Sequence, residues 1–245
     1  MKNVKIFLAL VFAAISSASF AQNNASLKLP AGFKATLFAD TIGSARHISI
    51  TSNGVVFAKL MYPNKAGKSI IRLEDKNNDG VADKISGWGK YGGTGIFVKG
   101  KSLYATSNTS VFLYQLNDQD EVEDPLGPKT IVKGLIDRNQ HESKSITLDG
   151  QGNIYVNIGA YSNACQEKDR MPGSKGMMPC PILDSAGGIW KFDGQKENQG
   201  GHLSVNPIIK QVKNKHDGDA HSSKSGMLDE VVFQRFLFSE SQGFG

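Results

Sequence analysis

The sequence predicts an all-β protein, a β-propeller, because a hairpin pattern recurs along it with a long and regular period. Each recurring segment has an alternating strand, a turn rich in Gly, Asn or Asp, and a second alternating strand, which is the signature of a β-hairpin. The segments are residues 46–58, 95–105 and 145–156. They follow one another at intervals of about 50 residues, the spacing expected of four-stranded propeller blades.

A strand of a second type follows each hairpin and ends in an acidic or amide-rich turn. These strands are residues 69–73, 110–116 and 188–192. The 27 glycines of the 245 residues fit a protein with many tight turns, and Ile, Val, Phe and Tyr, which favour strands, fill the runs between them. A β-sandwich or barrel would also have closely spaced turns, but it would not require similarity at a period of about 50 residues.

The blade pattern covers residues 28–198 and yields about three to four blades. A single blade cannot bury both of its faces, and a complete ring normally needs a longer chain. We therefore expect an incomplete propeller.

Residues 1–21 are predicted to be a signal peptide. A lysine-containing start precedes an apolar run over 6–15, and small residues then lead to an expected cleavage between Ala21 and Gln22. The run of about ten apolar residues is shorter than the roughly twenty that a membrane-spanning helix needs. An uncleaved anchor or a buried helix is the alternative. No later stretch is long and apolar enough to span a bilayer, so the mature chain is predicted to be periplasmic or secreted, without a transmembrane segment.

The charge pattern argues against a nucleic-acid partner. The formal net charge of the whole chain is +5, and two of the lysines that contribute to it lie in the predicted leader. Elsewhere no cluster of Arg and Lys is interleaved with aromatic residues, which is the pattern expected of a nucleic-acid-binding surface.

The two cysteines of the chain, Cys165 and Cys180, are predicted to form a disulfide. In an exported protein, an even pair separated by a short loop indicates a disulfide rather than a metal site. Closure of a loop of about 15 residues would stabilise the fold by roughly 3 kcal/mol in the chain-entropy model. Two free thiols would require a reducing compartment.

A possible calcium loop lies at residues 75–83, which read D-x-N-x-D-G-x-x-D. Oxygen-bearing side chains at alternate positions, with Gly at the sixth, are typical of such loops. The candidate ligands are Asp75, Asn77, Asp79 and Asp83. The twelfth position is Ser86 rather than Glu, and no helical pattern flanks the loop, so an EF-hand is not expected. A loose Ca²⁺ site and a plain turn that binds its own backbone are both open.

His141 is the candidate catalytic residue. It lies in a polar stretch just before the third hairpin, where a propeller brings side chains toward its central channel. An imidazole can accept a proton near neutral pH, as a general base requires. A histidine in a polar loop is, however, commonly a plain surface residue. The long segment 161–181 is either a binding loop or a disulfide-tied surface loop.

An ordered series of motifs resembles the soluble pyrroloquinoline-quinone (PQQ) sugar dehydrogenases, in particular their sorbosone dehydrogenase-like branch. The matching segments are residues 30–39, 45–48, 75–83, 141–145, 154–159, 162–165, 179–181 and 186–190. The resemblance runs from about residue 28 to residue 198, and the order of the motifs is far more specific than any one of them.

The resemblance implies a six-bladed propeller with PQQ bound over the central channel and Ca²⁺ holding the cofactor. It also implies that His141 is the base that takes the alcohol proton while hydride moves to the quinone, and that Gln140 and Arg46 contact the cofactor. Gln140 stands where glucose-oxidising relatives have an acidic residue. PQQ would carry the redox chemistry, the substrate would be a sugar or related alcohol or aldehyde, and a separate protein would accept the electrons.

Residues 199–245 are expected to form an aberrant or poorly ordered tail. They show neither a blade pattern nor the Gly-x-Arg-Asn stretch with which the family would continue. A frameshift or misjoined reading frame would produce such a tail, and a divergent domain is the alternative. The chain is therefore either a PQQ-dependent dehydrogenase, or a non-catalytic propeller fragment or ligand-binding module.

Overall fold

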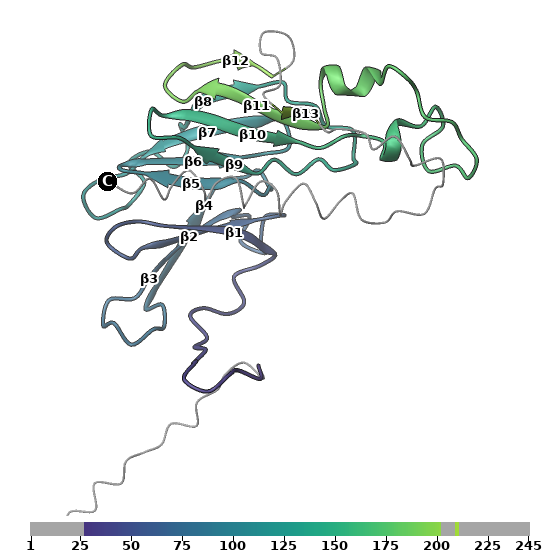
Figure 1. The fold of residues 1–245 in the computed structure, drawn as a ribbon. Coiled ribbons are helices and arrows are strands. Elements are labelled where there is room, and N and C mark those ends of the chain that lie inside the picture. Colours follow the sequence, from purple (N-terminus) through teal and green to yellow (C-terminus); the bar gives the residue numbers. More distant parts are fainter. Residues whose placement is uncertain (1–26, 202–208, 211–245) are drawn as a thin grey trace, which may run out of the picture. The chain divides into compact units, whose positions relative to one another are not determined.

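A computed structural model describes residues 27–201 and 209–210 (Figure 1). The chain divides into two units, of which the first ends at Phe38 and the second begins at Ala39. In the first unit, the backbone N–H of Phe33 donates to the carbonyl of Pro30 and closes a turn. The predicted signal peptide and most of the predicted tail lie outside the described residues. Within the described part, no helix is long and apolar enough to cross a membrane.

The second unit contains three β-sheets in its described part (Figure 1). The first sheet is formed by β1 (Ala45–Ile50), β2 (Val56–Leu60), β3 (Ile70–Glu74) and β4 (Lys84–Trp88). The second sheet is formed by β5 (Ile96–Lys99), β6 (Ser102–Thr106), β7 (Ser110–Gln115), β8 (Lys129–Lys133) and β12 (Gln199–Gly200). The third sheet is formed by β9 (Ile146–Leu148), β10 (Asn153–Ile158), β11 (Gly188–Asp193) and β13 (Ile209–Lys210). Each is an antiparallel meander, to which the second sheet adds β12, parallel to β8, and the third adds β13 beside β11.

The three sheets are arranged as successive propeller blades. In each sheet the first strand along the chain (β1, β5 or β9) lies at one edge. The short strands β12 and β13 lie at the opposite edges of the second and third sheets. Strand β5 contacts both β1 and β9, so these first strands lie side by side as the inner strands of a propeller do. The predicted hairpins are the pairs β1–β2, β5–β6 and β9–β10. The predicted all-β class and the incomplete propeller are therefore confirmed.

Two apolar cores lie between the sheets. The core between the first and second sheets includes Phe57, Trp88 and Tyr114. The Trp88 ring meets Phe57 at 6.0 Å and Tyr114 at 5.8 Å, both edge to face, a favoured aromatic geometry. The core between the second and third sheets includes Tyr104 and Trp190. The second sheet thus buries both of its faces, as a blade inside a propeller must.

The first sheet presents an exposed apolar face. Along β1, Ser49 is directed toward the second sheet, where its Oγ accepts a hydrogen bond from the backbone N–H of Val98 at 2.9 Å. Alternation along the strand puts Ile48 and Ile50 on the other face, where they are 61% and 56% exposed. This face is where a further blade would pack in a longer propeller.

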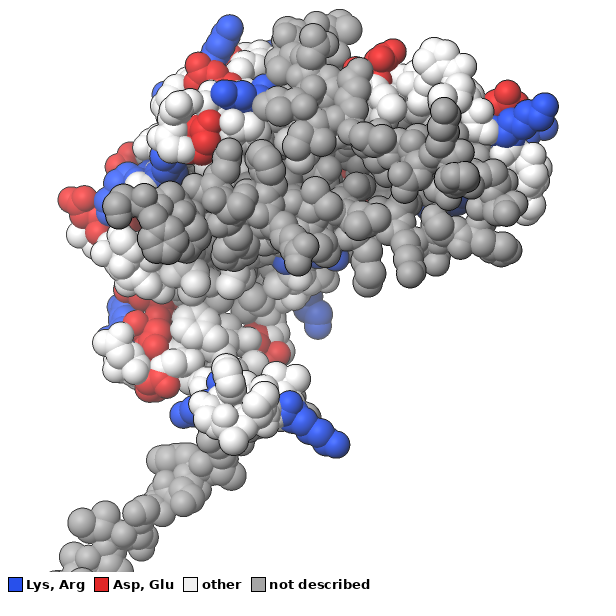
Figure 2. All heavy atoms as spheres, viewed as in Figure 1, with Lys and Arg blue, Asp and Glu red and all other residues white. Residues whose placement is uncertain are grey.

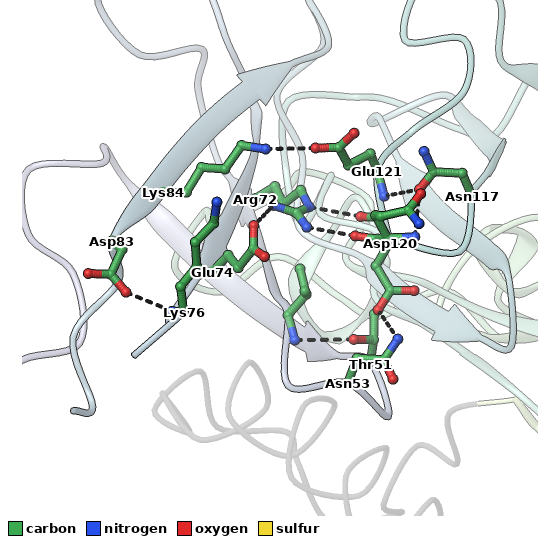
Figure 3. Close-up of polar contacts among 12 residues, drawn as sticks. Thr51, Asn53, Arg72, Glu74, Lys76, Asp83, Lys84, Asn117, Asp120 and Glu121 are labelled. Carbon is green, nitrogen blue, oxygen red and sulfur yellow. Dashed lines mark hydrogen bonds and ion pairs between the residues drawn. The ribbon is translucent and has the colours of Figure 1, made fainter. Parts of the chain in front are cut away.

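A buried arginine joins the first two sheets (Figure 3). Arg72 of β3 donates from Nε to the carbonyl of Asp120 and from Nη2 to the carbonyl of Gln119, each at 2.8 Å, in the turn between β7 and β8. Its Nη1 pairs with Glu74 at 2.7 Å. In the same turn, the Asp120 carboxylate accepts a hydrogen bond from Asn53 Nδ2 at 2.9 Å. The guanidinium therefore fixes the second blade against the first.

The strand directions define two edges of the assembled blades. The starting edge is where β1, β5 and β9 begin, and it carries the loops 61–69, 89–95, 134–145 and 159–187. The far edge is where these strands end, and it carries the turns 51–55, 75–83, 116–128 and 149–152. The second and third sheets are joined at the starting edge by a hydrogen bond of 2.8 Å from Thr106 Oγ1 to the carbonyl of Lys144.

Lys59 is a buried lysine near the starting edge of the first sheet. It is 1% exposed, and its Nζ donates to the carbonyl of Tyr91 and to Ser69 Oγ at 3.2 Å. Burial lowers the pKa of Lys59 to about 7. Burial likewise lowers the pKa of Lys144 to about 8. Both amines therefore lose much of their charge in the folded protein at mildly alkaline pH.

We expect Arg72→Met to lower the free energy of unfolding by about 3 kcal/mol, because it leaves buried carbonyls and Glu74 without their cation. Lys84→Met is the matched control, since the Lys84–Glu121 pair is about half exposed and should contribute less than about 1 kcal/mol. Denaturant titration of both variants measures the difference. Equal losses in the two variants would contradict the assignment of Arg72 as the inter-blade link.

Lys59→Met should flatten the dependence of stability on pH. The unfolded chain keeps the Lys59 proton up to the ordinary pKa of 10.5, whereas the folded chain releases it near pH 7. Unfolding therefore takes up a proton between these values, and stability rises with pH by at most about 1.4 kcal/mol per pH unit. Denaturant titrations between the two pH values should show a smaller rise in Lys59→Met and an unchanged rise in the control Lys65→Met, which replaces an exposed loop lysine.

Candidate functional site

His141 lies where two loops of the starting edge meet. It belongs to the β8–β9 loop, residues 134–145, and its exposed ring faces the β10–β11 loop, residues 159–187. His141 Nε2 lies 3.3 Å from Asn163 Oδ1. With that oxygen as the acceptor, Nε2 carries the hydrogen and Nδ1 keeps its lone pair. The ring is thus oriented with one nitrogen available to accept a proton.

Asp169 links the same two loops through its carboxylate. Gln140 Nε2, one residue before the histidine, donates to Asp169 Oδ2. The backbone N–H of Asn163 donates to Asp169 Oδ1 at 3.0 Å. Burial raises the pKa of Asp169, but hydrogen bonds from Gln140, the Asn163 backbone and Ser162 outweigh this and place the pKa below its ordinary value.

The guanidinium of Arg138 provides a further contact between the loops, 5.4 Å from the centre of the Tyr161 ring. This is the geometry of a cation–π interaction. Arg138 and Gln140 are two residues apart, so both ends of this short stretch are tied to the β10–β11 loop.

Backbone strain is concentrated in the two loops. Of the nine non-glycine residues with positive φ in the described part, five lie there. They are Asn139, His141, Ala164, Cys165 and Arg170, with φ between 46° and 56°. Residues other than Gly, Asn and Asp rarely adopt this region, and such strain gathers at functional sites.

The predicted disulfide between Cys165 and Cys180 is confirmed, with the two Cα atoms 6.0 Å apart. Cys165 is buried in the core between the second and third sheets, together with Ile182 and Ala186. The disulfide closes the β10–β11 loop on itself, and the buried Cys165 and Ile182 anchor it in this core, so the segment that carries Asn163 and Asp169 is held at both ends.

The two predicted cofactor contacts occupy different positions. Gln140 is part of the His141 cluster, and its Oε1 is buried without a hydrogen-bond partner. Arg46 lies at the start of β1 with an exposed side chain. It is on the same starting edge as His141, but β5 lies between β1 and β9. The structure therefore brings Gln140 to the candidate base and leaves Arg46 two blades away.

The predicted calcium ligands lie in the β3–β4 turn on the far edge. Asp75 Oδ1 and Oδ2 accept the backbone N–H groups of Asn78 and Gly80 at 2.7 and 2.8 Å. Asp83 Oδ2 accepts the N–H of Lys76 at 2.6 Å. This is the geometry of an Asx-rich turn that binds its own backbone. In the described part of the chain, no three His, Cys, Asp or Glu side chains gather in a metal-binding group.

Charged side chains of both signs are interspersed over the described residues on the face shown in Figure 2. Sequence reasoning did not single out Asp169, because nothing in the spacing of the loop distinguishes it from Glu167 or Asp184. Its contacts appear only once the two loops are placed together.

Similarity to solved structures shows the fold. An iodide structure of a Trichoderma reesei carbohydrate-active enzyme of family AA12 aligns with a TM-score of 0.54 and 17% identity, over 68% of this chain and 40% of that chain. The holo form of the pyranose dehydrogenase PQQ domain from Coprinopsis cinerea aligns with a TM-score of 0.55 and 14% identity, over 71% of this chain and 40% of that one. The chain thus spans 40% of the length of these structures.

Sequence comparison establishes the family. No curated protein matches the chain. Residues 27–178 match the model of the TrAA12-like family. The match covers more than half of the 245 residues and includes the first two blades, the His141 loop and the strained part of the β10–β11 loop. The chain belongs to the TrAA12-like family.

Proposed function

We propose that this chain carries the first blades of an exported PQQ-dependent dehydrogenase of a sugar or related alcohol or aldehyde, with His141 as its general base. The observation that carries the proposal is the exposed His141 ring, held by Asn163 at the edge where the inner strands begin. The similarity in fold to a PQQ domain supports it. The sorbosone dehydrogenase-like branch and a separate electron acceptor are parts of the same proposal.

His141 would accept the hydroxyl proton of the substrate at Nδ1, while Nε2–H stays hydrogen-bonded to Asn163 Oδ1. When bound, PQQ supplies the redox chemistry by taking the hydride from the carbon that bears the hydroxyl group. The hydroxyl proton of the substrate would move to the His141 imidazole, and the two electrons would leave the substrate as hydride. The two fixed loops hold the imidazole in place, which is the condition for efficient proton transfer.

The exposed guanidinium of Arg46 suits a quinone that bears carboxylates. The guanidinium of Arg46 can form a bidentate pair with a carboxylate. Gln140 Oε1 is buried beside His141 without a partner, and as an acceptor it could take a hydrogen bond only from an N–H or O–H group of a ligand. We propose these two residues as cofactor contacts. A Ca²⁺ ion bound by Asp75, Asn77, Asp79 and Asp83 would stabilise the β3–β4 turn rather than hold the cofactor, because that turn lies on the opposite edge from His141.

The disulfide supports export to an oxidising compartment, because such bonds persist in periplasmic and secreted proteins. A second candidate function is a non-catalytic propeller fragment or ligand-binding module. The exposed Ile48 and Ile50 favour it, since they leave one blade face uncovered. The two candidates differ in whether PQQ absorbance is retained by the protein after incubation with PQQ and Ca²⁺ and removal of free cofactor.

His141→Ala should abolish sugar oxidation without abolishing PQQ binding. After incubation with PQQ and Ca²⁺, we expect dye-linked oxidation by the parent chain and a rate lower by about 10²–10⁴-fold in the variant, the usual contribution of a general base. Glu167→Gln, an exposed change in the β10–β11 loop, is the control. An equal rate in His141→Ala and the parent would refute the role of His141, and absence of PQQ binding by the parent would favour the second candidate.

Gly159→Ala tests the placement of His141 from a neighbouring residue. A Cβ at Gly159 would lie 2.5 Å from both the Cβ and the carbonyl oxygen of His141, so the histidine must move. Because a displacement of about 1 Å can cost about 100-fold in rate, we expect a loss of kcat of that order. Gly150→Ala is the matched control, since its Cβ would meet no atom within 4 Å, and its kcat should equal that of the parent.

A further inference from the structure

We propose that Asp169 is a positioning residue that fixes the orientation of the His141 ring by hydrogen-bonding both of the loops that meet there. The proposal rests on the proposed function in one respect: a general base at His141 is the reason why the orientation of the ring would matter. The orientation itself is a property of the described residues and can be measured without cofactor or substrate.

The Asp169 carboxylate accepts a hydrogen bond from each of the two loops. One oxygen receives the amide of Gln140, the residue that precedes His141. The other receives the backbone N–H of Asn163, whose side chain contacts the His141 ring. The imidazole is thus held on two sides, through its own backbone neighbour and through its hydrogen-bond partner, and both supports end on the same side chain.

The strained backbone on both sides explains why such a support is needed. His141 and Ala164 both have positive φ, at 46° and 54°, a conformation that costs about 1–3 kcal/mol per residue and persists only when the surroundings over-determine it. Asp169 lies between the two strained stretches. Its side chain is 27% exposed, so its hydrogen bonds are partly shielded from water.

The hydrogen bonds of the Gln140 amide indicate which substitutions of Asp169 would break the contact between the two loops. Its Nε2 is bound by Asp169, while its Oε1 is buried without a partner. Asp169→Leu has a similar shape and removes both acceptors. Asp169→Asn keeps one acceptor for Asn163 and adds an N–H₂ group that Gln140 Oε1 can accept after rotation of its amide. An asparagine can therefore restore a hydrogen-bonded link, although it cannot restore a charge.

The test is NMR of the chain with labelled histidine rings, with the His141 signals assigned by their loss in His141→Gln. We expect the parent to give one ring state, with hydrogen on Nε2. Asp169→Leu should shift or broaden these signals, Asp169→Asn should restore them, and Glu167→Gln should leave them unchanged. Thermal melts of each variant show whether the fold is kept.

Unchanged His141 signals in folded Asp169→Leu would overturn the proposal. Equal changes in Asp169→Leu and Asp169→Asn would also overturn it, because they would show that charge rather than hydrogen bonding acts on the ring. Should Asp169→Leu not fold, Gln140→Met removes one of the two links from the other side, and unchanged ring signals there would count against the proposal in the same way. PQQ absorbance is recorded separately, so a failure of cofactor binding does not alter the outcome.

Discussion

The packing of the second sheet between the first and the third is the constraint on which the rest of the structure depends. Adjacent residues of β6 point to opposite faces, so Leu103 enters the core with the first sheet and Tyr104 enters the core with the third. Only a stack of sheets buries both faces of such a strand. Stacking brings β1, β5 and β9 side by side, and the loops that precede β5 and β9 then fall on one edge. The position of His141 follows from this arrangement.

The sequence was sufficient to predict the inner strands and the strand that follows each hairpin, because these carry alternating apolar residues that the cores require. The fourth strands, β4 and β8, were not predicted. Strand β4 contains Lys84, Gly87 and an exposed Ile85, and Trp88 at its end is its one buried residue. Strand β8 buries the adjacent residues Ile131 and Val132 between exposed lysines, so neither outer strand shows the apolar alternation on which the prediction relied.

In the candidate site, too, some residues were predictable from the sequence and others were not. His141 was found through its place before a hairpin, and the cysteine pair through its number and spacing. Asn163 and Asp169 act through contacts with residues 22 and 29 positions away, and such contacts depend on the path of two irregular loops, which has no period. Gln140 was predicted to leave the base without a carboxylate. In the structure a carboxylate lies next to Gln140 rather than next to His141, because the Gln140 amide donates to Asp169.

The parts of the candidate site differ in how far they depend on further blades. The His141 cluster lies between the second and third sheets, which pack against each other through one core, and the buried Cys165 anchors its second loop in that core. Arg46 lies on β1, the strand whose Ile48 and Ile50 face solvent. The proposed base is held by packing that needs no further blade, whereas the proposed cofactor, placed over the central channel, would need cations from around the ring. Binding of the proposed cofactor is therefore more sensitive to an incomplete ring than the orientation of His141.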